Sequence, residues 1–452
     1  MLKPYVKKML VAAGVLAAPC IVALSIYRFA VPVPYHDQWS MVPLLAKMHN
    51  HQLRIADLWA QLNEHRIMLP RIVMLALASV SGWNLYLEFA ATYIFAVAIL
   101  LLLYSMLRMT FQGRTPLWLI VVFSLVVFSP IQYDGWLWGF CGLSFFMTLF
   151  GTVLAIWSLE KWPGTLKGVL IAAAAAVFSS YSLSSGLFTW VVVGLMLLLR
   201  TPRKWGHIVI WVLAAAATIG LYLHNYTKPA HHPPLTLFMQ HPLMFVEYVL
   251  IYLGSPLGAG IPLEALLAGV VILVTGVIVL ILVLRHGRKE LAAMLPWIAL
   301  GAYAFIIACV TGMGRLGLGL AQAASSKYTA ASSMLILAVM VLFARWVAIC
   351  SGKVKHTPRK AAILSSLLLA LFVYGYTASI VFANGKMKQK YKILNPCLNA
   401  LKTFPDTPDE FLLKLGSNPS DPNVVRNHIR TLSELGIIVH SQTAGGKQET
   451  GR

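Results

Sequence analysis

The chain has 452 residues, of which 59% are apolar and only 11% are charged, with 36 Lys and Arg against 15 Asp and Glu. So little charge cannot cover the surface of a water-soluble protein of this length, and disordered, coiled-coil, collagen and disulfide-rich secreted classes are excluded as well. A basic excess is also typical of nucleic-acid binding, but here the Lys and Arg residues lie between long apolar runs, as the topology determinants of membrane proteins do. The composition therefore predicts an all-α, polytopic membrane protein that contacts membrane lipids and no nucleic acid.

Eleven apolar runs are candidates for crossing a hydrocarbon core of about 30 Å, which takes about 20 helical residues. They are residues 9–31, 84–107, 116–130, 136–159, 165–181, 185–199, 206–226, 262–284, 291–311, 328–350 and 361–383. The first run follows Lys3, Lys7 and Lys8 and is long enough to span, so we expect an uncleaved helix and not a signal peptide. The sequence thus predicts a bundle of about 11 transmembrane helices.

The distribution of positive charge predicts the orientation of this bundle. With the amino terminus in the cytoplasm, the five connections on the cytoplasmic side are all short and basic, as the positive-inside rule requires. These connections are residues 108–115, 160–167, 200–205, 285–290 and 351–360. An odd number of crossings then places the carboxyl-terminal tail on the outer side.

Two further apolar segments, 67–82 and 241–257, are too short to span, and we expect both to lie on the outer face as interfacial helices. In the first segment Leu69 precedes Pro70, so the helix is expected to begin at Pro70. Residues 385–452 change character, with proline-rich turns and short amphipathic stretches. The sequence therefore predicts a transmembrane catalytic domain, 1–384, with a first outer loop at 32–83, and a small soluble tail at 385–452.

Carboxylates collect on the predicted outer side, although loops simply need polar residues and this alone is an alternative explanation. The first outer loop opens with Asp37 between Tyr35 and Trp39, two aromatic residues suited to the headgroup level. A carboxylate there would be partly desolvated and more basic, as a general base should be. The alternative is an interfacial aromatic belt with an incidental aspartate.

The same loop contains Glu64-His65-Arg66, an acid, an imidazole and a fixed cation at consecutive positions, and Arg71 follows closely. On a loop these side chains can converge on one ligand, whereas on a regular helix consecutive residues diverge. The alternative is a local salt bridge that anchors the loop.

A second basic group lies between the ninth and tenth spans. Gly312–Gly317 formally reads GxGxxG, but it follows a membrane helix and not a strand, so we reject a dinucleotide site. Arg315 and Lys327, next to Tyr328, instead fit capture of an anionic headgroup. A helix-terminal arginine and a snorkelling lysine are the alternative explanation.

No metal or other cofactor is predicted. The pairs His49/His51 and His231/His232 have neither helical ligand spacing nor an adjacent carboxylate, and the five cysteines form no CxxC motif.

Several short motifs in this arrangement are similar to those of the GT-C superfamily of integral-membrane glycosyltransferases, in particular to bacterial members with Asp-x-Trp and Asn-Glu-His-Arg in the first outer loop. Here these motifs are Asp37-Gln-Trp39 and Asn63-Glu-His-Arg66. Trp138-Gly-Phe140 and Ser184-Ser-Gly186 match two further motifs. A Ser-Arg-Tyr motif is replaced by Ser326-Lys327-Tyr328, which keeps the charge but loses bidentate phosphate binding.

The resemblance implies a sugar donor linked to polyprenyl phosphate, a glycan or lipid acceptor of the cell envelope, such as O-antigen or lipopolysaccharide, and a bacterial inner membrane with transfer on its periplasmic face. By resemblance, Asp37 would be the catalytic base, and Arg66, Arg315 and Lys327 would bind the donor phosphate. We expect Glu64 to be catalytic as well. Trp39, His65, Arg71 and Tyr328 would bind substrate. The alternative function is a transporter or flippase of lipid-linked oligosaccharide, which would place charged or broken helices at mid-membrane.

Overall fold

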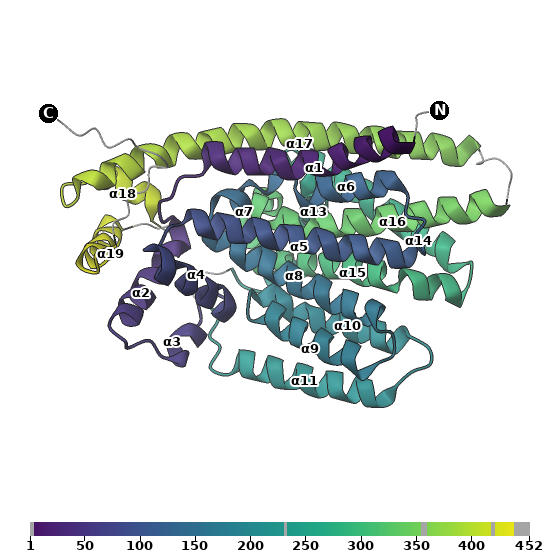
Figure 1. Cartoon of the computed structure of the whole chain (residues 1–452), viewed down its shortest axis with the longest axis horizontal. Helices are drawn as coiled ribbons and strands as arrows, with labels where there is room; N and C mark the ends of the chain where they lie inside the picture. The colour runs from purple at the N-terminus through teal and green to yellow at the C-terminus, as the bar shows by residue number, and fades with distance from the viewer. Residues whose placement is uncertain (1–3, 230–232, 354–358, 417–420, 438–452) are drawn as a thin grey trace.

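The computed structural model describes residues 4–229, 233–353, 359–416 and 421–437, which form an elongated bundle of helices (Figure 1). The chain is 82% helical, with no strand among the described residues, which confirms the predicted all-α polytopic class. Two predicted features, the histidine pair at 231–232 and the end of the tail at 438–452, lie outside the described residues.

Nine helical segments in the described part of the chain are long and apolar enough to cross a membrane. They are Met9–Phe29, Tyr86–Thr110, Leu117–Leu137, Gly139–Lys161, Trp205–Leu223, Pro262–Leu284, Arg288–Leu318, Ser326–Cys350 and Ser366–Thr403. The predicted spans 165–181 and 185–199 are also helical, but their helices α9 (Leu166–Ser180) and α10 (Phe188–Leu199) are shorter than the other nine. The predicted number of eleven is therefore too high by two on the criterion of length.

One of the two shortest predicted spans, 116–130, is longer than expected. Helix α6 (Leu117–Val127) continues through a 3-10 turn at Pro130 into α7 (Tyr133–Leu137). Proline suits the first position of a helical turn, because that position needs no amide donor. Residues 133–137 are thus the last part of a helical segment, and Trp136 among them is fully buried.

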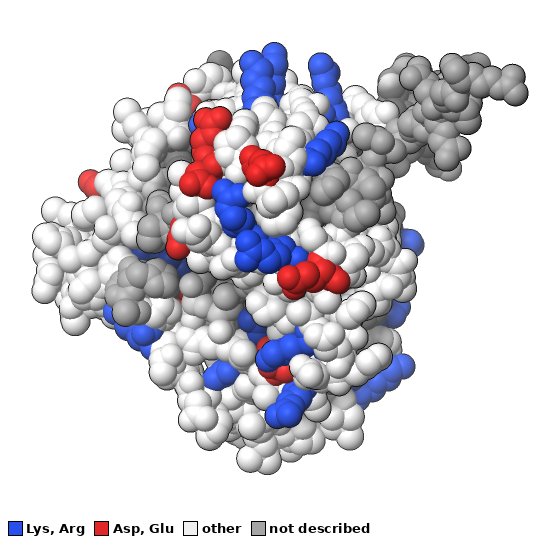
Figure 2. Space-filling model, turned by 90° about the vertical axis from the view of Figure 1, so that its left-hand side faces the viewer, with Lys and Arg blue, Asp and Glu red and all other residues white. Residues whose placement is uncertain are grey.

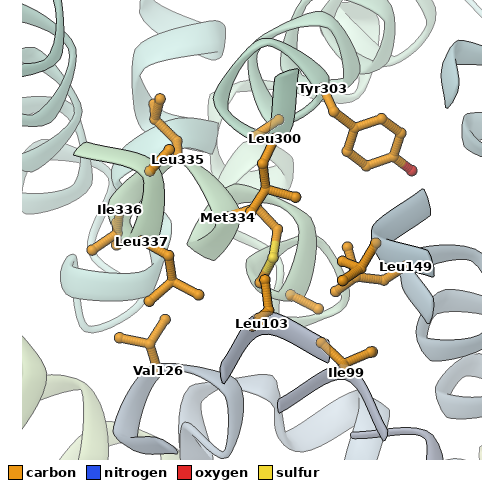
Figure 3. Packing of buried hydrophobic residues seen from close by; sticks show 14 of the residues in the cluster. Ile99, Leu103, Val126, Leu149, Leu300, Tyr303, Met334, Leu335, Ile336 and Leu337 are labelled. Atoms are coloured by element: carbon orange, nitrogen blue, oxygen red, sulfur yellow. The ribbon is translucent and has the colours of Figure 1, made fainter. Parts of the chain in front are cut away.

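The centre of the bundle is an apolar cluster to which several long helices contribute (Figure 3). Ile99 and Leu103 of α5 (Tyr86–Thr110) lie there with Leu300 of α15 (Arg288–Arg315) and Met334 of α16 (Thr329–Lys353). Small residues bring other backbones close together, as is usual between membrane helices. At Gly142 of α8 (Gly139–Lys161), for example, a side chain would overlap the carbonyl oxygen of Gly135.

The two segments expected as interfacial helices differ in their packing. Helix α4 (Met68–Ser81) belongs to the first outer loop and begins two residues before Pro70. Helix α13 (Pro242–Gly254) packs inside the bundle: Tyr248 and Tyr252 are fully buried, and the backbone of Gly254 contacts α14 (Pro262–Leu284). The expectation of a surface helix is therefore wrong for the second half of this segment, which three neighbouring helices cover, whereas Leu243 and Val246 in its first half are exposed.

The tail begins as a continuation of the last long helix. Helix α17 runs from Arg359 to Ala400, so the predicted domain boundary at 384 lies within it. The short helices α18 (Asp409–Leu415) and α19 (Pro422–Glu434) follow and lie at the same end of the molecule as α2 (Val42–His49) of the first outer loop (Figure 1).

The tail and the first outer loop share a second apolar cluster, separate from that of the bundle. Trp39 of the loop donates a hydrogen bond from Nε1 to the carbonyl oxygen of Leu415, at 3.0 Å, and its ring stacks on that of His428. The described part of the tail is therefore packed against the loop.

Candidate active site

Acidic and basic side chains are intermixed on the end of the bundle formed by the first outer loop and the tail (Figure 2). A cavity of about 480 Å³ is lined by residues from both the loop and the bundle. Six of the nine residues predicted for the site line it: Asp37, Glu64, His65, Arg315, Lys327 and Tyr328. The predicted residues that line the cavity thus come from segments almost 300 positions apart in the sequence.

The rest of the lining differs from this charged part. Phe145 and Leu149 of α8, Phe188 of α10 and Ile307 of α15 contribute apolar surface, and hydroxyl groups from Ser144 and Thr148 lie among them. A molecule that fills the cavity therefore meets both ionic groups and a larger number of apolar side chains.

A turn within the first outer loop determines the position of Glu64, the second residue of the Asn-Glu-His-Arg motif. Leu62 and His65 exchange backbone hydrogen bonds at 2.8 and 2.9 Å, which closes a two-residue turn over Asn63 and Glu64. Asn63 has φ +49°, a left-handed conformation that asparagine tolerates better than most residues. The turn puts Glu64 at its tip.

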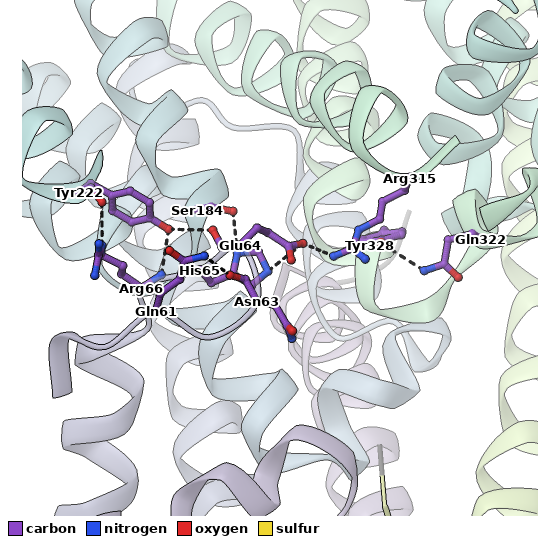
Figure 4. Close-up of polar contacts among 10 residues, drawn as sticks. All are labelled: Gln61, Asn63, Glu64, His65, Arg66, Ser184, Tyr222, Arg315, Gln322 and Tyr328. Atoms are coloured by element: carbon purple, nitrogen blue, oxygen red, sulfur yellow. Dashed lines mark hydrogen bonds and ion pairs between the residues drawn. The ribbon is translucent and has the colours of Figure 1, made fainter. Parts of the chain in front are cut away.

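Glu64 and His65 make the polar contacts at the centre of the site (Figure 4). The carboxylate of Glu64 pairs with the guanidinium of Arg315, which lies at the end of α15. The same oxygen lies 3.4 Å from Nε2 of His65, whose Nδ1 is 2.7 Å from the hydroxyl of Ser184. One turn of the loop therefore bridges α15 and the short helix η3 (Ser184–Leu187) across the cavity.

Arg66 does not line the cavity, contrary to its predicted role in phosphate binding. Its side chain is 4% exposed and donates hydrogen bonds to the backbone carbonyl groups of Trp59, Tyr222 and His224. Its own amide group donates to the hydroxyl of Tyr222 at 2.9 Å. Because the donors of the guanidinium are directed at backbone oxygens, Arg66 fixes the loop to α11 (Trp205–Leu223).

Arg71 and Trp39, both predicted to bind substrate, also point away from the cavity. Arg71 is 5% exposed and donates to the carbonyl groups of Leu58 and Ala60, at the end of α3 (Ile55–Trp59). Trp39 is buried against the tail. Both side chains thus hold the loop in place.

Asp37 lies on the 3-10 helix η1 (His36–Met41), and its neighbours fix this element. Gln38 donates to the buried carboxyl of Glu88 at 2.7 Å, and His36 has φ +49°, where a side chain is strained. Burial lowers the pKa of His36, although the charge of Asp37 opposes this, so we expect a neutral imidazole next to the carboxylate at pH 7.

Lys327 lies on another 3-10 helix, η7 (Ser326–Tyr328), directly before α16. The hydroxyl of Ser326 donates to the carbonyl of Ile131 at 2.8 Å and accepts from the amide of Asp134 at 3.0 Å. The ring of Tyr328 stacks on that of Tyr252, with centroids 5.1 Å apart. In the described part of the chain, no carboxylate lies within ion-pair distance of Lys327, so its charge faces the cavity without the compensation that Arg315 receives.

The sequence did not single out several residues that the fold brings to this site. Tyr222, Tyr252 and Tyr303 line the cavity from three different helices, and Lys390 of α17 pairs with Asp134 beside it. No local pattern distinguishes these tyrosines from other aromatic residues of the spans. Among the described residues there is no group of three or more His, Cys, Asp and Glu side chains that could hold a metal ion.

No protein family model and no curated protein is similar to this chain. Among solved structures, the archaeal oligosaccharyltransferase AglB from Archaeoglobus fulgidus, in complex with an inhibitory peptide and a dolichol-phosphate, is similar with a TM-score of 0.44 and 12% sequence identity. The similarity covers 90% of this chain and 60% of that one, so the chain spans less than two thirds of the length of this structure.

Proposed function

We propose that the cavity is the active site of a membrane glycosyltransferase, which transfers a sugar from a polyprenyl-phosphate-linked donor to a glycan or lipid acceptor of the cell envelope. The observation that carries the proposal is the lining of the cavity: Asp37 shares it with the cations Arg315 and Lys327 and with a large apolar surface. A lipid-linked phosphate needs this combination, because its head is anionic and its tail is apolar.

In the proposed reaction, a hydroxyl oxygen of the acceptor attacks the anomeric carbon of the donor sugar. The bond between that carbon and the phosphate oxygen breaks, and its electron pair stays on the phosphate. Asp37 accepts the proton of the attacking hydroxyl, and Lys327 and Arg315 stabilise the negative charge that develops on the phosphate. Preorganised charge of this kind usually supplies the largest part of the rate enhancement.

Glu64 has a supporting part in this scheme. Its carboxylate pairs with Arg315 and lies near His65, which in turn contacts Ser184. The ion pair with Glu64 holds the guanidinium of Arg315 at the end of α15 and partly neutralises its positive charge. Lys327 is therefore the stronger electrostatic partner for the phosphate. His65 and Tyr328 line the cavity where they can contact the sugar or the acceptor.

The proposal places the cavity on the periplasmic side of a bacterial inner membrane. The basic connections 108–115, 160–167 and 200–205 support this orientation through the positive-inside rule. The first outer loop and the tail lie at the same end of the bundle as the cavity, which is therefore the end that would face the periplasm (Figure 1).

The test is sugar transfer from a radiolabelled polyprenyl-phosphate sugar by membranes that contain the wild-type or the Asp37→Asn protein. The amide keeps the size of the side chain but cannot accept the proton, so we expect kcat to fall by about 100-fold or more. The exposed Asp409 of the tail, changed to Asn, is the matched control and should leave transfer unchanged. Undiminished transfer by Asp37→Asn would remove the assignment of the base.

The same preparation separates transfer from transport. If the wild-type protein moves the labelled lipid between leaflets without forming a glycosylated product, the flippase alternative replaces the proposal. Lys327→Ala should weaken donor binding, measured as a higher KM, while Lys47→Ala in the exposed part of the loop should not.

A further inference from the structure

Helix α17 is longer than a membrane crossing requires. The helical segment Ser366–Thr403, which contains most of α17, has 38 residues, whereas a crossing takes about 20. Beyond residue 383 its buried residues recur at helical spacing, as Met387, Leu394, Cys397 and Leu401. This spacing gives the outer part of the helix one face that packs against the rest of the protein.

Lys390 lies on this buried face, between Met387 and Leu394, and its side chain is only 11% exposed. The neighbouring lysines at 388 and 392 belong to other faces of the helix and are exposed. A lysine at a buried position costs stability unless its charge is compensated. The contacts of Lys390 therefore need an explanation that the other lysines do not.

The ammonium group of Lys390 contacts three residues next to the cavity. Its Nζ lies 2.9 Å from Oδ1 of Asp134, 4.9 Å from the ring centroid of Tyr35 and 5.7 Å from that of Trp138. The rings of Tyr35 and Trp138 meet edge to face, with centroids 5.6 Å apart. One cation thus joins an ion pair and two aromatic rings, an arrangement that is favourable when it is shielded from water.

Two of these partners are close in the chain or hydrogen-bonded to the neighbour of a proposed reacting group, and the third lines the cavity. Tyr35 is two residues before Asp37, on the chain that enters η1, and Trp138 lines the cavity itself. Asp134 donates its backbone amide to Ser326, the residue before Lys327. Lys390 itself does not line the cavity, so it acts on the site through its neighbours.

We propose that Lys390 is a positioning residue of the active site. By holding Asp134, Tyr35 and Trp138 together, its ammonium group sets the separation between Asp37 and Lys327, which act on the two sides of the bond that breaks. The inference rests on the proposed glycosyl transfer. It makes the chain beyond residue 384 a functional part of the site, because the bundle alone cannot supply this cation.

The test compares Lys390→Met, Lys390→Arg and Lys388→Met in the full-length protein with the radiolabelled donor. Because a displacement of about 1 Å can cost up to 100-fold in rate, we expect Lys390→Met to lower kcat by about tenfold or more. Donor KM should stay within about twofold, since Lys390 does not line the donor cavity. Lys390→Arg keeps the charge and should retain most of the rate, and Lys388→Met should match the wild type.

A double substitution tests whether Lys390 acts through Asp134. Asp134→Asn alone should reproduce the loss of kcat, and adding Lys390→Met should produce little further loss, because the two residues act as one unit. If Lys390→Met does not fold, Asp134→Asn and Lys390→Arg carry the test. Equal rates for Lys390→Met and Lys388→Met, or a change in KM alone, would overturn the inference.

A second measurement does not depend on enzymatic activity. In a protein whose five cysteines are replaced by serine, the thiol introduced by Asp37→Cys is labelled with a maleimide. We expect Lys390→Met to change the labelling rate by about threefold or more, and Lys388→Met to leave it unchanged. If labelling depends on Lys390 but the wild-type protein transfers no sugar, glycosyl transfer is wrong and the positioning inference holds. If the wild-type protein transfers sugar but labelling does not depend on Lys390, the inference alone is rejected.

Discussion

The four residues of the Asn-Glu-His-Arg motif have different functions in the structure. Asn63 forms the turn, Glu64 and His65 line the cavity, and Arg66 fixes the turn to the bundle. The resemblance of this motif implied phosphate binding by Arg66. The structure instead surrounds its guanidinium with backbone carbonyl groups, and no pattern of residue types indicates that direction.

Arg66 is therefore expected to contribute to stability more than to donor binding. Arg66→Met leaves the carbonyl groups of Trp59, Tyr222 and His224 without this donor, which should cost roughly 1–3 kcal/mol. Thermal unfolding in detergent measures the loss. Lys47→Met, which removes an exposed ion pair with Asp57, is the control and should cost less than about 1 kcal/mol. If Arg66→Met leaves the midpoint of thermal unfolding unchanged but raises the KM for the donor, Arg66 binds the phosphate, and its proposed role in stability is wrong.

The predicted site residues that line the cavity share one property: each is an ionic or polar group in an outer connection of a chain that is mostly apolar. Asp37, Arg315 and Lys327 stand out for this reason, and all three line the cavity. Lys390 could not be found in this way, because it is one of four closely spaced lysines in a polar tail. Its partner Asp134 is 256 positions away, and only the fold brings the two together.

At the scale of helices, hydropathy identified the apolar segments but did not predict how they pack against one another. Each predicted span corresponds to a helix, because a long apolar run has few other stable conformations in a membrane. Whether a short apolar helix lies on the surface or in the bundle depends on its neighbours, which hydropathy does not report. The packing of helix α13 was missed for this reason, and its one glycine, Gly254, rather than its apolar residues, is the signal that could have indicated a close contact.

Gly254 tests this packing directly. A methyl group there would overlap the backbone of α14 at Ala265 and Gly269, so Gly254→Ala should destabilise the protein by roughly 1–3 kcal/mol. At Gly220 of α11 an added methyl group meets no other atom within 4 Å, so Gly220→Ala should stay within about 1 kcal/mol of the wild type. Thermal midpoints in detergent compare the two variants. Equal midpoints would mean that α13 and α14 are not in close contact.

At the scale of the whole molecule, the chain forms two apolar clusters that meet near the cavity. One is the bundle, and the other joins the first outer loop to the tail. The sequence predicted the loop and the tail as separate features on one side of the membrane. Their association could not be predicted, because it depends on contacts such as that between Trp39 and Leu415, which are 376 positions apart.

The central claim is that this cavity, at one end of the bundle, receives a lipid-linked phosphate. Photo-crosslinking with a diazirine-labelled polyprenyl phosphate, followed by mapping of the modified peptides, tests it most directly. We expect adducts on the segments that line the cavity, at 62–67, 184–188 and 311–331, and fewer adducts in the Lys327→Ala protein. Adducts confined to the opposite end, at connections such as 108–115 and 285–290, or spread evenly over the outer surfaces of the long helices, would contradict the account.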